Sequence, residues 1–262
     1  MNELPSRTGF LGSKDVLYGL IAILVIAWGT TGSGLSWEEA REGIPYMGSL
    51  VMEMIPPSFE RIEPVSKAIL ETFQIALTGA GLGIFLSIFL AVLSAKNMTK
   101  YKSIRFFARG IVSFFRTIPD LVWAIFFVST VGLGPFAGTL TIMIDTLGFC
   151  GRFFAEAFEE VEQEPINALE AMGANPLSIF FANVFPASFP SLINTSLFSV
   201  EKAVRSSVVL GLVGAGGIGI ELKVAMDMFQ YSEASTIILL IFVMVLAVEQ
   251  LNMRLRRKVM SI

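Results

Sequence analysis

Six long runs of apolar residues alternate with short polar links along this chain. A helix needs about 20 predominantly apolar residues to cross the hydrocarbon core of a bilayer. Each run is close to that length, so the pattern predicts an all-α, polytopic membrane protein with about six transmembrane helices. The expected spans are residues 16–37, 69–95, 106–131, 135–154, 186–213 and 236–253.

The first apolar run has two interpretations. Lys14, a short apolar stretch and the small residues that follow it are also typical of a secretory signal peptide. No convincing Ala-x-Ala cleavage site follows the run, and Trp37 at its end suits a membrane interface. We therefore favour a retained transmembrane helix, and a signal peptide is the alternative.

Basic residues gather in three clusters: before the first run, between the second and third, and after the sixth. With six spans, all three clusters fall on one side of the membrane. Short loops rich in Lys and Arg lie on the cytoplasmic side, so both termini are expected there. The link 38–67 and the glycine-rich link after residue 213 are then outside. The basic residues are Arg7 and Lys14; Lys96, Lys100, Lys102 and Arg105; and Arg254, Arg256, Arg257 and Lys258.

Composition agrees with membrane insertion and removes several kinds of chemistry. Apolar residues make up 54% of the 262 residues and charged residues 16%, whereas soluble domains carry about 25% charged residues. The single cysteine, Cys150, excludes a disulfide within the chain. The absence of histidine excludes a Ser-His-Asp triad and most zinc sites.

The cytoplasmic link 151–185 is acidic, and its pattern predicts two short helices. Pro165 suits a first helical position, and good helix formers follow it. Asn175 is pushed out of the helical region by the proline after it, so the first helix ends there. Pro176 can begin a second helix that stops before Pro186. The result is a bent helical pair with small residues that a partner can approach closely; an ordinary helical connector is the alternative.

The segment NALEAMGANPLSIFFANVFPASFP resembles the EAA loop of ABC-importer permeases, which docks in a groove of the nucleotide-binding subunit. Gly173 and Pro186 match the glycine and proline of that pattern, Ala168 matches an alanine, and Asn167 replaces the expected glutamate. The other departures are Leu169, Asn183 and Phe185. The resemblance implies that the residues coupling this chain to an ATPase are Asn167, Ala168, Glu170, Ala171, Gly173, Ala174, Pro176 and Pro186.

Two further segments are similar to the phosphonate and phosphite permeases of the same superfamily. They are FFRTIPDLVWAIFFV, residues 114–128, and VEKAVRSSVVLGLVGAGGIG, residues 200–219. The glycine-rich end recurs in methionine-type and osmolyte-type importers, so it supports the superfamily more than the substrate. Together with the EAA loop, the resemblance covers most of residues 68–253.

The resemblance implies the MetI-like core of a type I ABC importer, acting as a permease and not as an enzyme. The solute would be phosphonate, phosphite or a similar oxyanion, with methionine or another solute as the alternative. The implied partners are an ABC ATPase, a periplasmic or lipid-anchored substrate-binding protein, a second permease copy and the lipid bilayer, with no nucleic acid. The ATPase would use ATP and Mg, and this chain would bind no cofactor.

The same resemblance places the chain in the bacterial inner membrane as a multi-pass protein. We expect three parts: an N-terminal tail, first helix and external link at 1–67, a permease core at 68–253, and a basic cytoplasmic tail at 254–262.

The segment GAGGIG superficially matches a phosphate-binding glycine loop. A dinucleotide fingerprint needs a strand before its glycines, whereas a membrane helix precedes these, and the sequence has no Gly-Lys dipeptide for a Walker A loop. The chain is therefore not expected to bind ATP. Gly214, Gly216, Gly217 and Gly219 would instead allow a tight turn and close helix packing. A flexible loop is the alternative.

Charged residues inside an apolar span are costly and are candidates for function. In the fifth run, Glu201, Lys202 and Arg205 are such residues. Glu201 and Arg205 lie four residues apart, so they share a helical face and can neutralise each other. They form either a structural ion pair or part of a translocation pathway.

Arg116 and Asp120 present the same choice in the third run, around a kink at Pro119. The guanidinium groups of Arg116 and Arg205 suit the oxygens of a phosphonate anion. The predicted pathway or gate consists of Arg116, Pro119, Glu201, Arg205, Gly214, Gly216, Gly217 and Gly219.

Gly79 and Gly83 in the second run have GxxxG spacing, which favours close helix contact within the chain or with a second copy. Two other classes of membrane protein fit the sequence less well. Secondary carriers often have inverted repeats, and no obvious repeat is present. A membrane enzyme needs a catalytic constellation that the sequence lacks.

Overall fold

The structure is a computed structural model that describes residues 13–34 and 36–260, and within these residues it contains helices and no β-strand. The predicted all-α class is confirmed, while Arg7, used above for orientation, lies outside the described residues. The helices are α1 (Ser13–Gly32), α2 (Trp37–Glu53), α3 (Ile62–Ser94), α4 (Lys102–Thr117), α5 (Asp120–Val131), α6 (Pro135–Glu159), α7 (Gln163–Ala171), α8 (Pro176–Ile179), the π-helix η1 (Phe180–Val184), α9 (Phe185–Gly211), α10 (Ile218–Asp227) and α11 (Tyr231–Met260).

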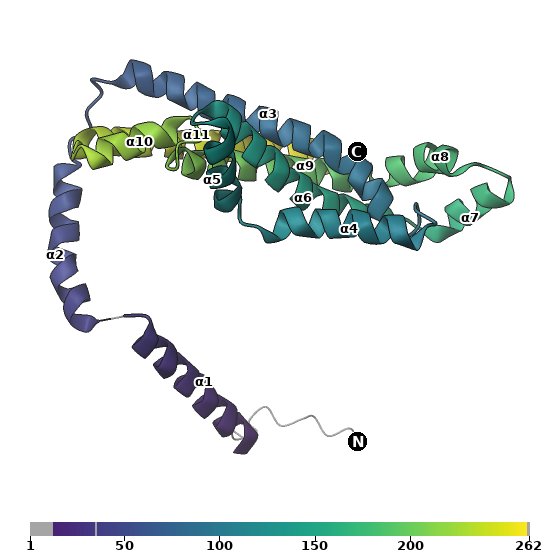
Figure 1. The fold of residues 1–262 in the computed structure, drawn as a ribbon, viewed down its shortest axis with the longest axis horizontal. Helices are drawn as coiled ribbons and strands as arrows, with labels where there is room; N and C mark the ends of the chain where they lie inside the picture. The colour runs from purple at the N-terminus through teal and green to yellow at the C-terminus, as the bar shows by residue number, and fades with distance from the viewer. Residues whose placement is uncertain (1–12, 35, 261–262) are drawn as a thin grey trace, which may run out of the picture. The chain divides into compact units, whose positions relative to one another are not determined.

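The chain divides into two units, residues 1–53 and residues 54–262. In the first unit, α1 is an apolar helix long enough to cross a membrane, and α2 is a more polar helix with Pro45 inside it. The second unit contains α3 to α11 and all the charged and glycine-rich candidates of the sequence. Figure 1 shows its long helices α3, α6 and α9 running side by side.

Four stretches are long and apolar enough to span a membrane, and α4 with α5 adds a fifth if that bent pair is one span. The sequence predicted about six spans, and by length and composition alone the described residues supply four or five. The four stretches are Asp15–Gly32, Ile62–Ser94, Pro176–Gly211 and Tyr231–Lys258.

The predicted span 106–131 is broken into two helices. α4 and α5 meet at an angle of 89°, far more than the kink expected at Pro119. Ile118 takes an extended conformation, with φ −82° and ψ 123°, as residues before proline prefer. Proline also donates no backbone hydrogen bond, so the helix is interrupted here and restarts at Asp120.

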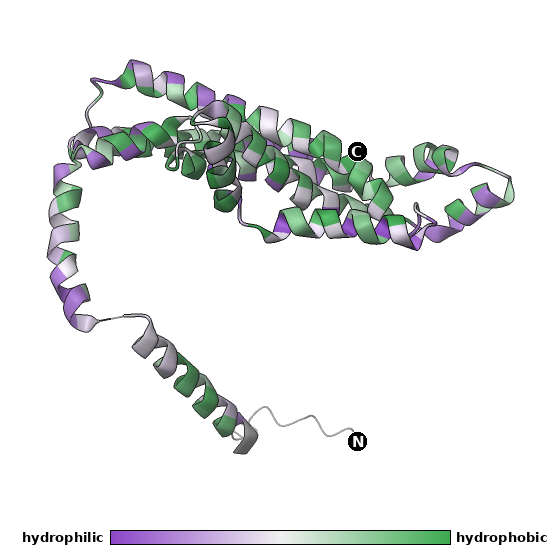
Figure 2. Cartoon of the chain, in the orientation of Figure 1, coloured by the Kyte–Doolittle hydropathy of each residue, from purple (hydrophilic) through white to green (hydrophobic). Residues whose placement is uncertain are grey.

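The predicted span 135–154 corresponds to α6, which is longer than expected and is not among the helices apolar enough to span on their own. α6 packs against α3, α4, α5 and α9, and about half of its residues are buried. A helix that is covered by other helices needs little apolar surface of its own, which explains its lower hydropathy. In Figure 2, α3 is green over much of its length, as expected for a lipid-facing helix.

Close contact between α3 and α6 depends on the two glycines with GxxxG spacing. A Cβ on Gly79 would lie 2.8 Å from the Cβ of Ile142, and one on Gly83 would lie 2.7 Å from the Cβ of Thr146. Both distances are too short for real side chains, so only glycine allows this approach. Within the chain, the predicted close helix contact is confirmed.

Gly83→Ala should therefore destabilise the fold by about 1–3 kcal/mol, because its new methyl group overpacks the α3–α6 contact. Gly81→Ala adds the same methyl two residues away, where nothing lies within 4 Å. That control should be neutral or raise stability by up to about 1 kcal/mol through helix propensity. Thermal unfolding of the purified protein in detergent measures both, and equal effects would contradict the packing.

Candidate functional site

Residues 163–184, which comprise α7, α8 and η1, form a helical bend between α6 and α9 that we call the coupling element. It projects past the adjacent ends of α3 and α4 (Figure 1). Gly173 has a φ of 82° and donates its N–H to the carbonyl of Glu170, which closes the end of α7. The side chain of Asn175 accepts a hydrogen bond from the N–H of Ser178 at 2.8 Å and so caps α8. The predicted break between two short helices is confirmed.

The sequence predicted that the second helix stops before Pro186, and this prediction is wrong. The chain continues through η1 directly into α9. Phe185 donates its N–H to the carbonyl of Phe180, five residues earlier, and Pro186 occupies an early position of α9. Proline has no N–H to donate and its ring crowds the preceding turn, and the wider π-turn before it makes room for that ring. The coupling element is therefore continuous with α9.

The inner face of the coupling element is anchored on α6. Ile166, Phe180 and Val184 are buried in one apolar cluster with Phe154 and Phe158. The rings of Phe158 and Phe180 meet edge to face, with centroids 5.5 Å apart. The outer face of α7 and its turn lies outside this cluster, and its exposed residues include five of the predicted coupling residues: Asn167, Ala168, Glu170, Ala171 and Gly173.

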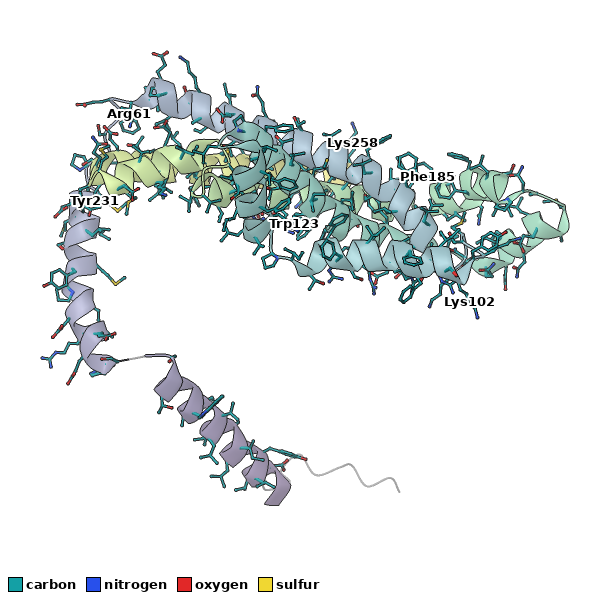
Figure 3. All side chains as sticks on the ribbon, in the orientation of Figure 1. Arg61, Lys102, Trp123, Phe185, Tyr231 and Lys258 are labelled. Carbon is teal, nitrogen blue, oxygen red and sulfur yellow. The ribbon has the colours of Figure 1, made fainter. Side chains whose placement is uncertain are left out.

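A polar corner joins the adjacent ends of α3, α4 and α6. The carboxylate of Glu159 accepts hydrogen bonds from the backbone N–H of Lys96 at 2.7 Å and from Arg109 at 2.5 Å. Arg109 also donates to the carbonyl of Ser94 at 2.9 Å. Figure 3 shows Lys102, at the start of α4, on the side of this unit from which α7 and α8 project. The corner fixes the base of the coupling element to the rest of the unit.

The glycine-rich segment after α9 is a tightly packed turn. Gly214, Gly216 and Gly217 have φ values of 89°, 88° and 77°, which L residues with side chains rarely adopt. A Cβ on Gly219 would collide with the carbonyl oxygen of Val208 in α9. The tight turn and close packing predicted from the sequence are confirmed, and the flexible-loop alternative is wrong.

Side chains of α3 hold this turn in place. The N–H of Gly217 donates to the carboxylate of Glu71 at 3.0 Å, and the N–H of Ile218 donates to the hydroxyl of Thr72 at 2.7 Å. Thr72 is fully buried and donates its own hydroxyl hydrogen to the carbonyl of Ala68. The start of α10 is therefore fastened to α3 by two hydrogen bonds that the sequence did not reveal.

The charged residues of α9 include the predicted ion pair. Arg205 and Glu201 form a salt bridge one helical turn apart, with 57% and 13% of their side chains exposed. Asn252 of α11 lies 3.5 Å from the second carboxylate oxygen of Glu201 and donates to the carbonyl of Leu197 at 2.9 Å. Glu201 is thus held from two helices, which supports a structural role for its side chain.

A second ion pair was missed in the sequence. Lys202 of α9 contacts both carboxylate oxygens of Asp145 in α6, each at 2.8 Å. Its ammonium group also lies 5.3 Å from the ring centre of Phe149. Asp145 lies inside an apolar stretch, IMIDTLG. A carboxylate in such a stretch needs a partner, and this was the sequence signal that could have indicated the ion pair.

Arg116 and Asp120 are not paired in the structure. The break between α4 and α5 separates them, so the geometry of neighbouring helical turns is lost. Asp120 accepts a hydrogen bond from the N–H of Leu121, and Arg116 has an exposed side chain at the end of α4. The backbone of Arg116 lies against Gly148 of α6, where a Cβ would come within 2.8 Å of its nitrogen. Arg116 therefore lies near the middle of α6, one turn from Asp145.

Charged residues inside apolar helices are typical of functional sites in membrane proteins, and in this chain they occur together with a projecting helical bend. Residues 83–259 match the family of binding-protein-dependent transport system inner membrane components, and the chain belongs to this family. It is accordingly a multi-pass protein of the inner membrane.

Permeases of other bacteria are similar to this chain over about half to most of its length. The phosphite transport system permease protein PtxC of Stutzerimonas stutzeri is 30% identical over 94% of this chain and 88% of its own length. The putative phosphite transport system permease protein HtxC of the same organism is 33% identical over 90% of this chain and 83% of its own. The methionine import system permease protein MetP of Bacillus subtilis is 30% identical over 48% of this chain and 60% of its own.

Solved structures have the same fold. Inward-facing conformations of the MetNI methionine ABC transporter match with a TM-score of 0.62 at 24% identity, covering 75% of this chain and 98% of theirs. A second crystal form of that transporter matches with a TM-score of 0.61 at 27% identity, over 74% and 94% of the two chains. The MetI-like permease core predicted for this chain is confirmed.

Thr72→Val should destabilise the fold by about 1–3 kcal/mol, because it leaves the buried N–H of Ile218 without its acceptor. Thr141→Val is the matched control: Thr141 is equally buried, but its hydroxyl donates only to Ala137 of its own helix. Replacing it should cost well under 1 kcal/mol, since the carbonyl keeps its helical partner. Chemical denaturation in detergent compares the two, and a Thr141→Val loss as large as that of Thr72→Val would contradict the anchoring role.

Proposed function

We propose that this chain is the membrane-spanning permease of an ATP-driven importer for phosphite, phosphonate or a similar small oxyanion. Two of the relatives that align with nine-tenths or more of it are named phosphite transport permeases and a third is named a phosphate-import permease, and these names are the observation that most favours a small oxyanion. Lys202 and Arg205 inside α9, together with Arg116 at the end of α4, are cations that suit an anionic solute.

A separate ABC ATPase is proposed to dock on the outer face of the coupling element. The small side chains there, Ala168 and Ala171, are exposed and leave the backbone of α7 open to close approach. The inner face is fixed to α6 by buried phenylalanines, so a push on the outer face acts on a rigid body. ATP and Mg belong to that ATPase in this proposal, and this chain serves as a translocation subunit without a cofactor.

Motion of the coupling element would reach the membrane through two helices. α6 enters the element and α9 leaves it without a break in helical structure after η1. A rigid-body shift of the element therefore displaces α6 and α9 together or against each other, which would open the interior alternately to each side.

The proposal also includes the other partners of the importer. A periplasmic or lipid-anchored binding protein delivers the solute on the side of the glycine turn, and a second permease copy completes the path. In this proposal both termini and the coupling element are cytoplasmic, as the positive-inside rule favours for the six spans predicted from the sequence.

Methionine is the second candidate substrate, because permeases of methionine importers share the fold and about half of this chain's sequence range. The zwitterionic solute would need both a cationic and an anionic contact, whereas a small oxyanion needs cationic contacts alone. The two candidates are distinguished by direct transport.

Vesicles containing the complex of this chain, its ATPase and its binding protein should take up labelled phosphite only when ATP is present. Labelled methionine, the second candidate substrate, serves as the control solute and should not accumulate. Vesicles with this chain alone, under a proton or sodium gradient, should accumulate neither. Phosphite uptake driven by the gradient without the ATPase would contradict the proposal, as would uptake of methionine in place of phosphite.

Ala168→Trp should abolish phosphite uptake and release the ATPase during purification, because a large ring blocks close approach to α7. The thermal stability of the free permease should not change, since Ala168 is exposed. Ala168→Ser keeps a small side chain at the same position and should retain uptake. Retained ATPase binding and uptake in Ala168→Trp would argue that docking occurs elsewhere.

A further inference from the structure

The ion pair between Asp145 and Lys202 joins the middle portions of α6 and α9. Both carboxylate oxygens lie 2.8 Å from the ammonium nitrogen, and 19% and 36% of the two side chains are exposed. A charge that faced hydrocarbon would be strongly disfavoured. The accessible part of Lys202 is therefore expected to face a polar path or a protein surface and not lipid.

The two ion pairs on α9 differ in how firmly they are held. Glu201 contacts Arg205 on its own helix and Asn252 on α11, so its position is fixed from two sides. Asp145 has hydrogen bonds to Lys202 alone among the described residues. The Asp145–Lys202 pair is consequently the one that a competing anion can open by displacing a single partner.

The chemistry of Lys202 suits exchange of one anion for another. Its ammonium is a compact charge with three donors on a flexible stem, so it can follow a moving ligand. The oxygens of a phosphite or phosphonate anion can occupy the positions of the two Asp145 oxygens. Leaving Lys202 without any anion inside the bilayer would be costly, so one partner must replace the other directly.

The position of the pair connects it to the coupling element. α6 and α9 are the two helices that the element joins, and the pair bridges them. Any shift of α6 against α9 changes the distance between the carboxylate and the ammonium. The pair can thus be closed in one state of the transport cycle and open in another.

We propose that Asp145 and Lys202 form a charge latch: Lys202 binds the translocated oxyanion, and Asp145 is the counter-ion that the oxyanion displaces and that closes the path again after release. This inference rests on the proposed function, since it requires an anionic solute. The backbone nitrogen of Arg116 lies against Gly148, one turn of α6 from Asp145, so this residue adds a second cation to the same part of the unit.

The test uses vesicles containing the complete complex and the double variant Asp145→Asn/Lys202→Gln. This variant removes both charges and keeps polar side chains of nearly the same size. No charge is left unpaired, so the fold should tolerate the change if the pair is only structural. The matched control is Glu63→Gln/Lys67→Gln, which neutralises an exposed ion pair at the start of α3. ATP hydrolysis and phosphite uptake are measured for each complex.

We expect the double variant to hydrolyse ATP but to take up phosphite at least about tenfold more slowly, the factor that loss of one charged hydrogen-bond partner commonly causes. The Glu63→Gln/Lys67→Gln control should transport like the wild type. Uptake by the double variant at the wild-type rate would overturn the latch and leave the proposed function intact. If the wild-type complex takes up no phosphite, the proposed function and the latch both fail.

Asp145→Asn alone gives a second readout that a structural role does not predict. Lys202 then lacks its counter-ion and should bind other oxyanions, so sulfate should inhibit phosphite uptake more strongly than in the wild type. Unchanged phosphite uptake and unchanged inhibition by sulfate would show that Asp145 does not compete with the solute, and would overturn the latch.

Discussion

The position of α6 at the centre of its unit is the constraint on which the rest of the structure depends. Backbone groups inside a bilayer must be satisfied within helices, and polar side chains there must be shielded by protein. Four helices pack around α6: α3, α4, α5 and α9. The glycines of α3 allow that helix to approach α6 closely. This covering allows α6 to carry Thr141, Asp145 and Thr146 where a lipid-facing helix would not tolerate them.

The covering of α6 also links the two functional regions of the chain. The C-terminal end of α6 supports the coupling element through buried phenylalanines, and its middle carries the carboxylate that pairs with Lys202. At the other end, the turn after α9 packs on the start of α6 and on α3 through glycines and Thr72. One helix thus touches the coupling element, the charge pair and the glycine turn, which is the arrangement that the proposed drive by a separate ATPase requires.

The sequence predicted features that depend on local chemistry. Hydropathy located most helices, GxxxG spacing indicated a close contact, and Asn175 before Pro176 ended α7. It did not predict features that depend on how helices are rotated against each other. Asp145 and Lys202 are 57 positions apart and meet only because α6 and α9 face each other. The two helices that meet at 89° at Pro119 both pack on α6, which the sequence does not reveal. The continuity through Pro186 required a π-turn that no spacing rule signals.

Relative motion of α6 and α9 is the central claim of this account, and a reversible cross-link between them tests it most directly. The hydroxyl oxygens of Thr146 and Ser199 lie 3.5 Å apart across the two helices, close to the charge pair. In the variant Thr146→Cys/Ser199→Cys with Cys150→Ser, oxidation should form a disulfide that stops ATP-driven phosphite uptake, and a reductant should restore it. Uptake that continues at the same rate with the disulfide intact would contradict the account.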